Sequence, residues 1–474
     1  MVADLAGDGS NWGQPGDVER RIAQRTRAMV IGPYPAQPRR RRADAAAETS
    51  RAPEARIEEA AGLAAAIELD VRASTIVPLN EIRPATYLGK GKVAEFAAIV
   101  KEGDVALVVM DCALSPVQQR NLEKALGAKV IDRTGLILEI FGRRARTREG
   151  ALQVELAHLA YQRSRLVRSW THLERQRGGF GFLGGPGETQ IETDRRLIQD
   201  RMVRIERELE GVKRTRALHR KSRRAVPFPV VALVGYTNAG KSTLFNRLTQ
   251  AHVVAEDILF ATLDPTLRAL PLPHGGKAII SDTVGFISDL PTMLVSAFRA
   301  TLEEVVEASA ILHVRDIVRE DSEAQSADVL AILDQLGIDA DDADRVIEVW
   351  NKIDLLEGDA RVVVRNAPRR RQGKKRLAVV SARTGEGMAE LLGAIEEVLA
   401  IGHSLFDVAV APSDGAGLHW LYENAAVLDR HTGEDGAVQL TVRVAPDRLD
   451  RLHRRFPGAV AMGRPARKRI GRRV

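Results

Sequence analysis

Hydrophobic and polar residues alternate with different periods along the chain, and each period predicts a different kind of structure. Between residues 55 and 148, short apolar runs such as 105–110 and 129–131 alternate with segments of helical pattern such as 115–126. This alternation predicts a small N-terminal α/β domain with a parallel sheet. Residues 1–54 are rich in Gly, Pro, Ala and charge and show no apolar period, so we expect a disordered basic extension there.

Residues 149–225 follow a helical period instead. Their apolar residues recur at spacings of four and three, at Leu152, Leu156 and Leu159 and then at Ile198, Met202, Ile205, Leu209 and Val212. We predict two long amphipathic helices that pair as an antiparallel hairpin. The other faces of both helices are rich in arginine.

The segment between these helices, residues 175–189, is rich in glycine and carries basic and aromatic residues. A loop of this composition is usually either a flexible linker or a functional element. Aromatic rings that stack on bases and arginines that meet phosphates favour RNA as its partner. The expected RNA contacts are Arg175, Arg177, Gly178, Gly179, Phe180, Phe182, Gly185 and Gly187.

A Val-rich run, a glycine-containing loop and a helix start follow one another at the beginning of a third region, residues 226–402. Gly235 and Gly240 are followed by Lys241 and Ser242 in the spacing of a P-loop. The two glycines let backbone amides turn towards phosphate oxygens at a helix N-terminus. Lys241 can reach the β- and γ-phosphates, and Ser242 can bind Mg²⁺. We therefore expect a P-loop domain.

Later motifs suit the phosphates and the metal. Thr262 stands where a switch I loop belongs and can close onto Mg²⁺ when a γ-phosphate is present. Asp282 ends a strand-like run and would hold Mg²⁺ through water. The amide of Gly285, three residues later, would meet the γ-phosphate. The predicted catalytic residues are Lys241, Thr262 and Gly285.

A carboxylate further along makes the predicted site selective for guanine. Asp354 can accept two hydrogen bonds from guanine N1 and the 2-amino group, which adenine cannot supply. The backbone of Ser381 and Ala382 can meet guanine O6. The full set of predicted nucleotide-binding residues is Gly235, Asn238, Ala239, Gly240, Lys241, Ser242, Thr243, Asp282, Gly285, Asn351, Lys352, Asp354, Ser381 and Ala382.

Phe286 occupies the position at which Ras-like enzymes carry a glutamine that orients the attacking water. Because phenylalanine has no hydrogen-bonding group, we expect slow hydrolysis by the free protein. Either a binding partner or a monovalent cation must then complete the site. Asn238 resembles the asparagine that some GTPases use to bind K⁺ beside the phosphates, although it could merely bond the loop backbone.

The remaining features set broader limits. A small C-terminal α/β domain is expected over residues 403–474, with a helix at 418–428 and a basic tail. That tail and the charge run at 369–376 could each be a solvated segment or an RNA contact. The net charge of +7 favours an anionic partner. The single cysteine, Cys112, excludes an intramolecular disulfide and is expected to be a core residue of a cytoplasmic protein without a membrane span.

Several segments resemble the HflX family of translational GTPases. They are 132–134, 144–147, 153–156, 185–196, 236–243, 259–266 and 282–286, of which 185–196 is the most specific. The resemblance covers residues 55–455 and implies an N-terminal α/β domain with a helical hairpin, a GTPase domain and a small C-terminal domain. It further implies GTP-dependent binding to the large ribosomal subunit and, in several members, splitting of stalled ribosomes.

The combined prediction is a monomeric GTP-hydrolysing factor whose partners are GTP, GDP and the large ribosomal subunit, and which separates or rescues stalled ribosomes. The alternative is an RNA-binding or ribosome assembly factor whose GTPase only times its release. The residues do not distinguish the two.

Overall fold

The computed structural model describes residues 26–36, 51–170, 186–223, 228–250, 259–260, 266–289, 299–370, 376–433 and 436–462. The chain divides into two compact units. The first contains residues 1–221 together with two short segments from further along the chain, 256–264 and 288–299. The second contains the remaining residues.

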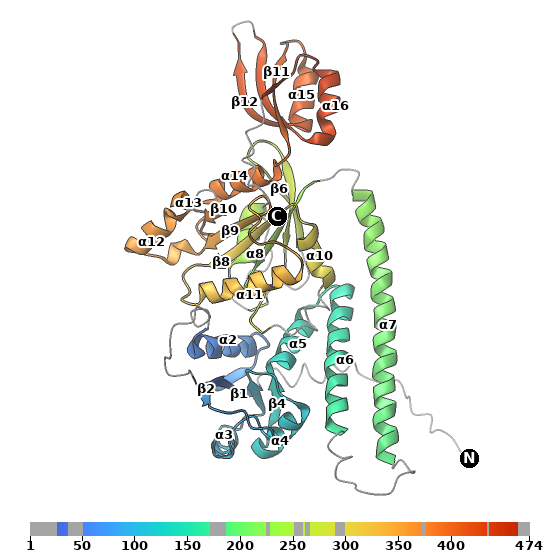
Figure 1. The fold of residues 1–474 in the computed structure, drawn as a ribbon, viewed down its shortest axis with the longest axis vertical. Helices are drawn as coiled ribbons and strands as arrows, with labels where there is room; N and C mark the ends of the chain where they lie inside the picture. Colours follow the sequence, from blue (N-terminus) through green and yellow to red (C-terminus); the bar gives the residue numbers. More distant parts are fainter. Residues whose placement is uncertain are drawn as a thin grey trace, which may run out of the picture. The chain divides into compact units, whose positions relative to one another are not determined.

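A parallel four-stranded sheet in the order β2-β1-β3-β4 lies at the centre of the first unit. Its strands are β1 (Arg27–Pro35), β2 (Asp70–Leu79), β3 (Leu107–Met110) and β4 (Lys129–Asp132). The associated helices are α2 (Pro53–Ala65), α3 (Lys90–Glu102), α4 (Pro116–Leu126) and α5 (Arg133–Arg144). Helices α3 and α4 pack with the strands in one apolar core, whereas α2 and α5 contact each other and the sheet (Figure 1). The predicted N-terminal α/β domain is confirmed.

Local sequence signals explain where these elements begin. Ser115 and Gln118 form a reciprocal capping box at the start of α4, which satisfies two otherwise unpaired backbone amides. The Asp132 carboxylate accepts a hydrogen bond from the Gly135 amide at the start of α5.

Cys112 packs partly buried against the apolar core of this domain, and burial raises the pKa of its thiol to about 12, as suits a packing role.

The strand β1 corrects our expectation that residues 1–54 form a disordered extension. Arg27–Pro35 pairs in parallel with both β2 and β3, and residues 28–34 are buried. A strand that is covered on both faces has no reason to alternate apolar and polar residues. The run Ala-Met-Val-Ile therefore shows no period, and the Gly and Pro residues around it resemble a linker.

Two long helices, α6 (Arg148–Trp170) and α7 (Pro186–Arg223), lie side by side (Figure 1). Leu152 near the start of α6 packs against Ile205 and Leu209, which are in the second half of α7. The predicted antiparallel hairpin is therefore confirmed. Helix α7 begins at Pro186, so the last residues of the expected glycine-rich loop belong to its first turn, a position where the missing amide of proline costs nothing.

The second unit contains a six-stranded sheet in the order β10-β9-β8-β5-β7-β6, in which only β6 is antiparallel. Its strands are β5 (Val230–Gly235), β6 (Thr266–Pro271), β7 (Lys277–Asp282), β8 (Ala310–Asp316), β9 (Val346–Asn351) and β10 (Arg376–Val379). Its helical segments are α8 (Lys241–Thr249), α10 (Arg299–Glu307), α11 (Ser322–Gln335), η3 (Ile353–Leu355), α12 (Gly358–Arg365), α13 (Ala367–Arg370) and α14 (Met388–Leu399). Helices α8 and α14 share one apolar core with the strands. This is the predicted P-loop GTPase fold.

The C-terminal domain is a four-stranded antiparallel sheet in the order β12-β13-β11-β14 with two helices. Its elements are β11 (Ser404–Val410), α15 (Gly415–Asn424), β12 (Ala426–Thr432), β13 (Val438–Val444), η4 (Pro446–Arg448), α16 (Leu449–Arg455) and β14 (Val460–Met462). The helix that we expected over 418–428 ends at Asn424 instead. Residues 426–432 instead pair with β13. Our expected helix was too long because the short apolar run at its end fits a helix as well as a strand.

Candidate functional site

The loop between β5 and α8 has the backbone that a phosphate-binding loop requires. Gly235 and Gly240 have φ angles of +154° and +90°. A Cβ at either position would overlap the Val314 carbonyl oxygen or the Asn351 amide nitrogen, respectively. Asn238, between them, also adopts a left-handed φ of +60° and is exposed. The loop thus turns its backbone inwards at the start of α8, where helix amides favour an anion.

Two charged or polar side chains follow at the start of α8. Lys241 is buried, its Nζ donates a hydrogen bond to the Tyr236 carbonyl oxygen at 2.7 Å, and burial lowers its pKa to about 8. The Ser242 hydroxyl donates to Asp282 Oδ2 at 2.7 Å, which brings an α8 side chain and a β7 carboxylate together. A hydroxyl and a carboxylate at one point are ligands that suit Mg²⁺. The pair therefore fits the predicted metal site.

The segment after β7 is joined to this loop by its backbone. The Phe286 amide donates to the Gly235 carbonyl at 3.1 Å, and the Thr237 amide donates to the Phe286 carbonyl at 2.8 Å. A Cβ on Gly285 would lie 3.1 Å from Lys241 Nζ, so a larger residue would crowd the lysine. The Phe286 side chain is buried and offers no group that could orient water.

Asn351 connects three loops at the other end of the site. Its Nδ2 donates to the Ala239 carbonyl at 2.9 Å, and its Oδ1 accepts from the Ala382 amide at 3.0 Å. Asp354 is half-buried, and its Oδ1 accepts from the Ser381 hydroxyl at 2.7 Å. The residues predicted to recognise guanine are thus held together and attached to the P-loop.

Lys352 depends on an acidic residue that sequence reasoning missed. Its Nζ lies 2.8 Å from the carboxylate of Asp316, the last residue of β8, and its backbone has a φ of +69°. Its position could have identified Asp316, because it ends a buried parallel strand and ligand sites of such sheets lie at the carboxyl ends of the strands.

Other predicted residues cannot be placed in this way. Thr262 and the predicted RNA contacts from Arg175 to Gly185 lie outside the described residues, as do Arg371–Lys375 and the basic tail from 463 onwards. Gly187 lies in the first turn of α7. Thr243 is exposed on α8, and Ala239 is buried.

Within the described part of the chain, no three His, Cys, Asp or Glu side chains gather as a metal site, and no helix is long and apolar enough to cross a membrane. Of the residues predicted to hold Mg²⁺, the described part of the chain brings Ser242 and Asp282 together.

Four family models match successive parts of the chain. They are "GTP-binding GTPase N-terminal" over 54–142, "GTP-binding GTPase Middle Region" over 144–223, "50S ribosome-binding GTPase" over 230–352 and "HflX C-terminal domain" over 367–463. The GTPase HflX of Magnetococcus marinus is 50% identical over 396 residues, which cover 84% of this chain and 89% of that protein. The chain belongs to the HflX family of GTPases.

A second HflX relative, the GTPase HflX of Escherichia coli, is 46% identical over 381 residues, covering 80% of this chain and 87% of its own length. Among solved structures, a GTP-binding protein from Sulfolobus solfataricus in complex with GDP is 21% identical, with a TM-score of 0.43 over 79% of this chain and 99% of that one. The first matched HflX region starts at residue 54, so the central strand β1 lies before it.

Proposed function

We propose that this HflX-family chain is a GTP-hydrolysing factor that binds the large ribosomal subunit and dissociates or rescues stalled ribosomes. The observation that carries the nucleotide half of the proposal is the set of contacts around Asn351, which joins the P-loop to the Asp354 and Ser381 side of the site. The description of the matched GTPase region as ribosome-binding supports the other half.

Guanine selectivity follows from how the Asp354 carboxylate is held. One of its oxygens already accepts a hydrogen bond from Ser381, which fixes the orientation of the group beside the Ala382 backbone. A carboxylate held in this way accepts from guanine N1 and the 2-amino group and leaves adenine with an unmatched edge. A base that leaves a buried hydrogen-bonding group of the site unpaired binds much more weakly than one that pairs with it.

Phosphate binding and hydrolysis use the other end of the site. The P-loop amides and Lys241 would hold the phosphates, while Ser242 and Thr262 would bind Mg²⁺ directly and Asp282 would do so through water. When bound, Mg²⁺ neutralises negative charge on the β- and γ-phosphate oxygens. Because Phe286 is buried and apolar, this chain supplies no glutamine at the water-orienting position, and hydrolysis by the free protein is slow. The ribosome then accelerates it.

The hairpin of α6 and α7 is the part of the chain proposed to reach ribosomal RNA, through the glycine-rich segment at its tip. Not all of its arginines are available for this. Arg165 is bound to the Asp132 carboxylate at 2.6 Å, and Arg201 pairs with Glu155 at 2.8 Å. These two therefore stabilise the hairpin and its attachment, and RNA binding is assigned to the tip. The protein would act as a monomer in the cytoplasm, where ribosomes are found.

Co-sedimentation with purified large subunits tests this proposal. We expect more protein in the subunit fraction with a non-hydrolysable GTP analogue than with GDP, because nucleotide state sets the affinity. The Asp354→Asn variant serves as the matched control, since it should lose the response to the GTP analogue and respond to a xanthosine analogue. Absence of binding in every nucleotide state would contradict the proposed partner.

A further inference from the structure

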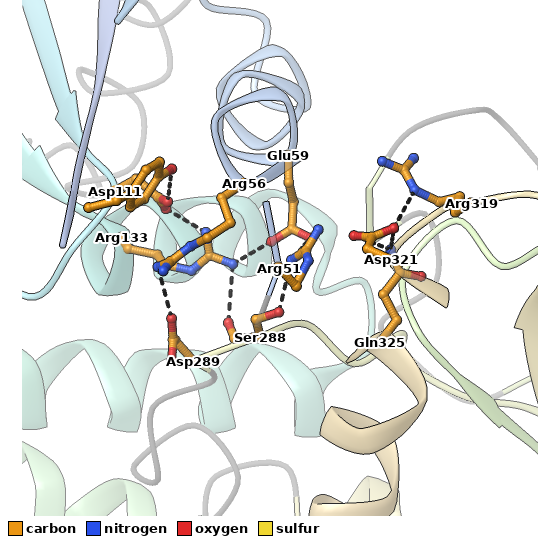
Figure 2. A network of polar contacts seen from close by, with 11 residues as sticks. Arg51, Arg56, Glu59, Asp111, Arg133, Ser288, Asp289, Arg319, Asp321 and Gln325 are labelled. Carbon is orange, nitrogen blue, oxygen red and sulfur yellow. Dashed lines mark hydrogen bonds and ion pairs between the residues drawn. The ribbon is translucent and has the colours of Figure 1, made fainter. Parts of the chain in front are cut away.

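Four charged side chains form a buried cluster in the N-terminal domain, well away in sequence from the nucleotide motifs (Figure 2). Arg133, the first residue of α5, lies 2.5 Å from Asp111 and 2.6 Å from Glu59, and Arg51 lies 2.7 Å from Glu59. Their side chains are between 1% and 7% exposed. We call Arg51, Glu59, Asp111 and Arg133 the arginine–carboxylate cluster.

The charges of this cluster balance. Burial alone would lower the pKa of Arg133, but the carboxylates of Asp111 and Glu59 raise it, so the guanidinium remains charged. The Tyr34 hydroxyl donates to Asp111 at 2.6 Å and fixes that carboxylate from the other side. The guanidinium groups of Arg133 and Arg51 are therefore held in place by carboxylates.

Both guanidinium groups also contact one residue from a distant part of the chain. Arg133 donates to the Ser288 carbonyl oxygen at 3.1 Å, and Arg51 donates to the Ser288 hydroxyl at 2.9 Å (Figure 2). Next to it, Arg56 lies 3.4 Å from the Asp289 carboxylate. Ser288 follows Gly285 by only three residues.

Residues just before Thr262, in the predicted switch I loop, also touch this domain. Phe260, two residues before Thr262, packs edge-on against Phe141 of α5, with ring centroids 4.7 Å apart. A Cβ on Gly62 of α2 would lie 3.2 Å from Leu259. Residues close in sequence to Thr262 and to Gly285 thus contact the N-terminal domain.

Stability alone is a poor explanation for the arginine–carboxylate cluster. A buried ion-pair network generally contributes no more than apolar residues of the same volume, because desolvation offsets the attraction. What it provides is geometry, because a guanidinium held by carboxylates offers donors in a fixed plane. Here those donors point at the backbone and side chain of Ser288.

We propose that Arg133 and Arg51 are positioning residues for GTP hydrolysis, and that they act by holding Ser288 and through it the Gly285–Phe286 backbone. This inference rests on the proposed GTPase function. The short segment is then fixed at both ends, by the arginines at Ser288 and by the Phe286–Gly235 backbone bond. A donor that is fixed before the reaction stabilises the charge of the γ-phosphate without reorganising.

Hydrolysis without ribosomes is the measurement that tests the inference. We expect Arg133→Met to lower kcat roughly tenfold, since a small displacement of a catalytic group has effects of this order or larger. The Kd for GDP should change less than about twofold, because GDP lacks the γ-phosphate that Gly285 meets. Arg133→Lys should recover part of the rate, because its ammonium restores a positively charged donor group, although without the planar geometry of a guanidinium.

Arg165→Met is the matched control. Like Arg133, Arg165 forms an ion pair with a buried carboxylate of this domain, that of Asp132. Its other contacts are with Gln119 and the Tyr161 ring, far in sequence from Ser288. The kcat of the Arg165→Met variant without ribosomes should equal that of the unaltered protein. If Arg133→Met does not fold, Ser288→Ala decides, since it removes only the hydroxyl acceptor of a half-buried residue, and a reduced kcat is expected.

An unchanged or raised kcat in Arg133→Met, or in Ser288→Ala where the first variant is unfolded, would overturn the positioning role. This result differs from a failure of the proposed function. In that case the unaltered protein itself would show no GTP hydrolysis, with or without large subunits.

Discussion

Asp354 is the residue on which the choice of base depends. In the Asp354→Asn variant the acceptor that faces guanine becomes a donor, which suits the xanthine edge. We expect affinity for GTP to fall by about tenfold or more and affinity for xanthosine triphosphate to rise, since a lost hydrogen bond to a charged group costs roughly 1.5–3 kcal/mol. Titration with fluorescent analogues of both nucleotides measures this. Unchanged GTP affinity would remove the guanine assignment.

A variant of Asn238 tests whether K⁺ or the ribosome supplies the positive charge that stabilises the transition state. Its exposed side chain and left-handed backbone lie between Gly235 and Gly240, beside the expected phosphates. If it binds K⁺ there, the cation can take the place of an arginine finger. We expect faster hydrolysis in K⁺ than in Na⁺ at equal ionic strength, and no difference in Asn238→Ala.

Equal rates in the two salts, measured with and without large subunits, would contradict the cation hypothesis. The ribosome would then be the sole proposed activator, and Asn238 would serve only to shape the loop.

Residues of the site could be predicted from the sequence where they belong to contiguous motifs. Asn351 and Lys241 were identified because spacing within a few residues defines their roles, and the structure brings their segments together. Asp316 and Arg133 were not, because their partners Lys352 and Ser288 lie 36 and 155 residues away along the chain. A single carboxylate or arginine at such a separation leaves no local pattern.

The hairpin tip is the element whose removal separates nucleotide binding from action on the ribosome. Deleting residues 178–187 should leave GTP and GDP affinity unchanged, because no predicted nucleotide contact lies in that segment. It should abolish ribosome splitting and lower ribosome-stimulated hydrolysis. Fluorescence titration and sedimentation measure the two effects. Full splitting activity in the deletion would mean that the tip is only a linker.

At the scale of elements, periodicity predicted helices better than strands. The stripe of α7 was visible because Ile205 and Leu209 recur at helical spacing on a polar background, and both are buried against α6. The strand β1 was missed because both of its faces are covered, and β12 because no glycine or proline separates it from the preceding helix. Their pairing partners, rather than their own sequences, specify them.

At the scale of the whole molecule, the order of domains was predictable but the division into compact units was not. Residues 256–264 and 288–299 belong in sequence to the GTPase region and in space to the first unit. Phe260 and Ser288, which attach these segments to the first unit, lie on loops. No periodic pattern reports such contacts, and they carry the proposed link between the N-terminal domain and hydrolysis.

Sedimentation of assembled ribosomes tests the central claim most directly. Incubation with the protein and a non-hydrolysable GTP analogue should lower the peak of joined ribosomes and raise the peaks of free subunits. With GDP, and in the Asp354→Asn variant given the GTP analogue, the profile should not change. If the subunits remain joined while the protein travels with the large subunit, the splitting function is wrong. The chain would then be a GTP-regulated binding or assembly factor.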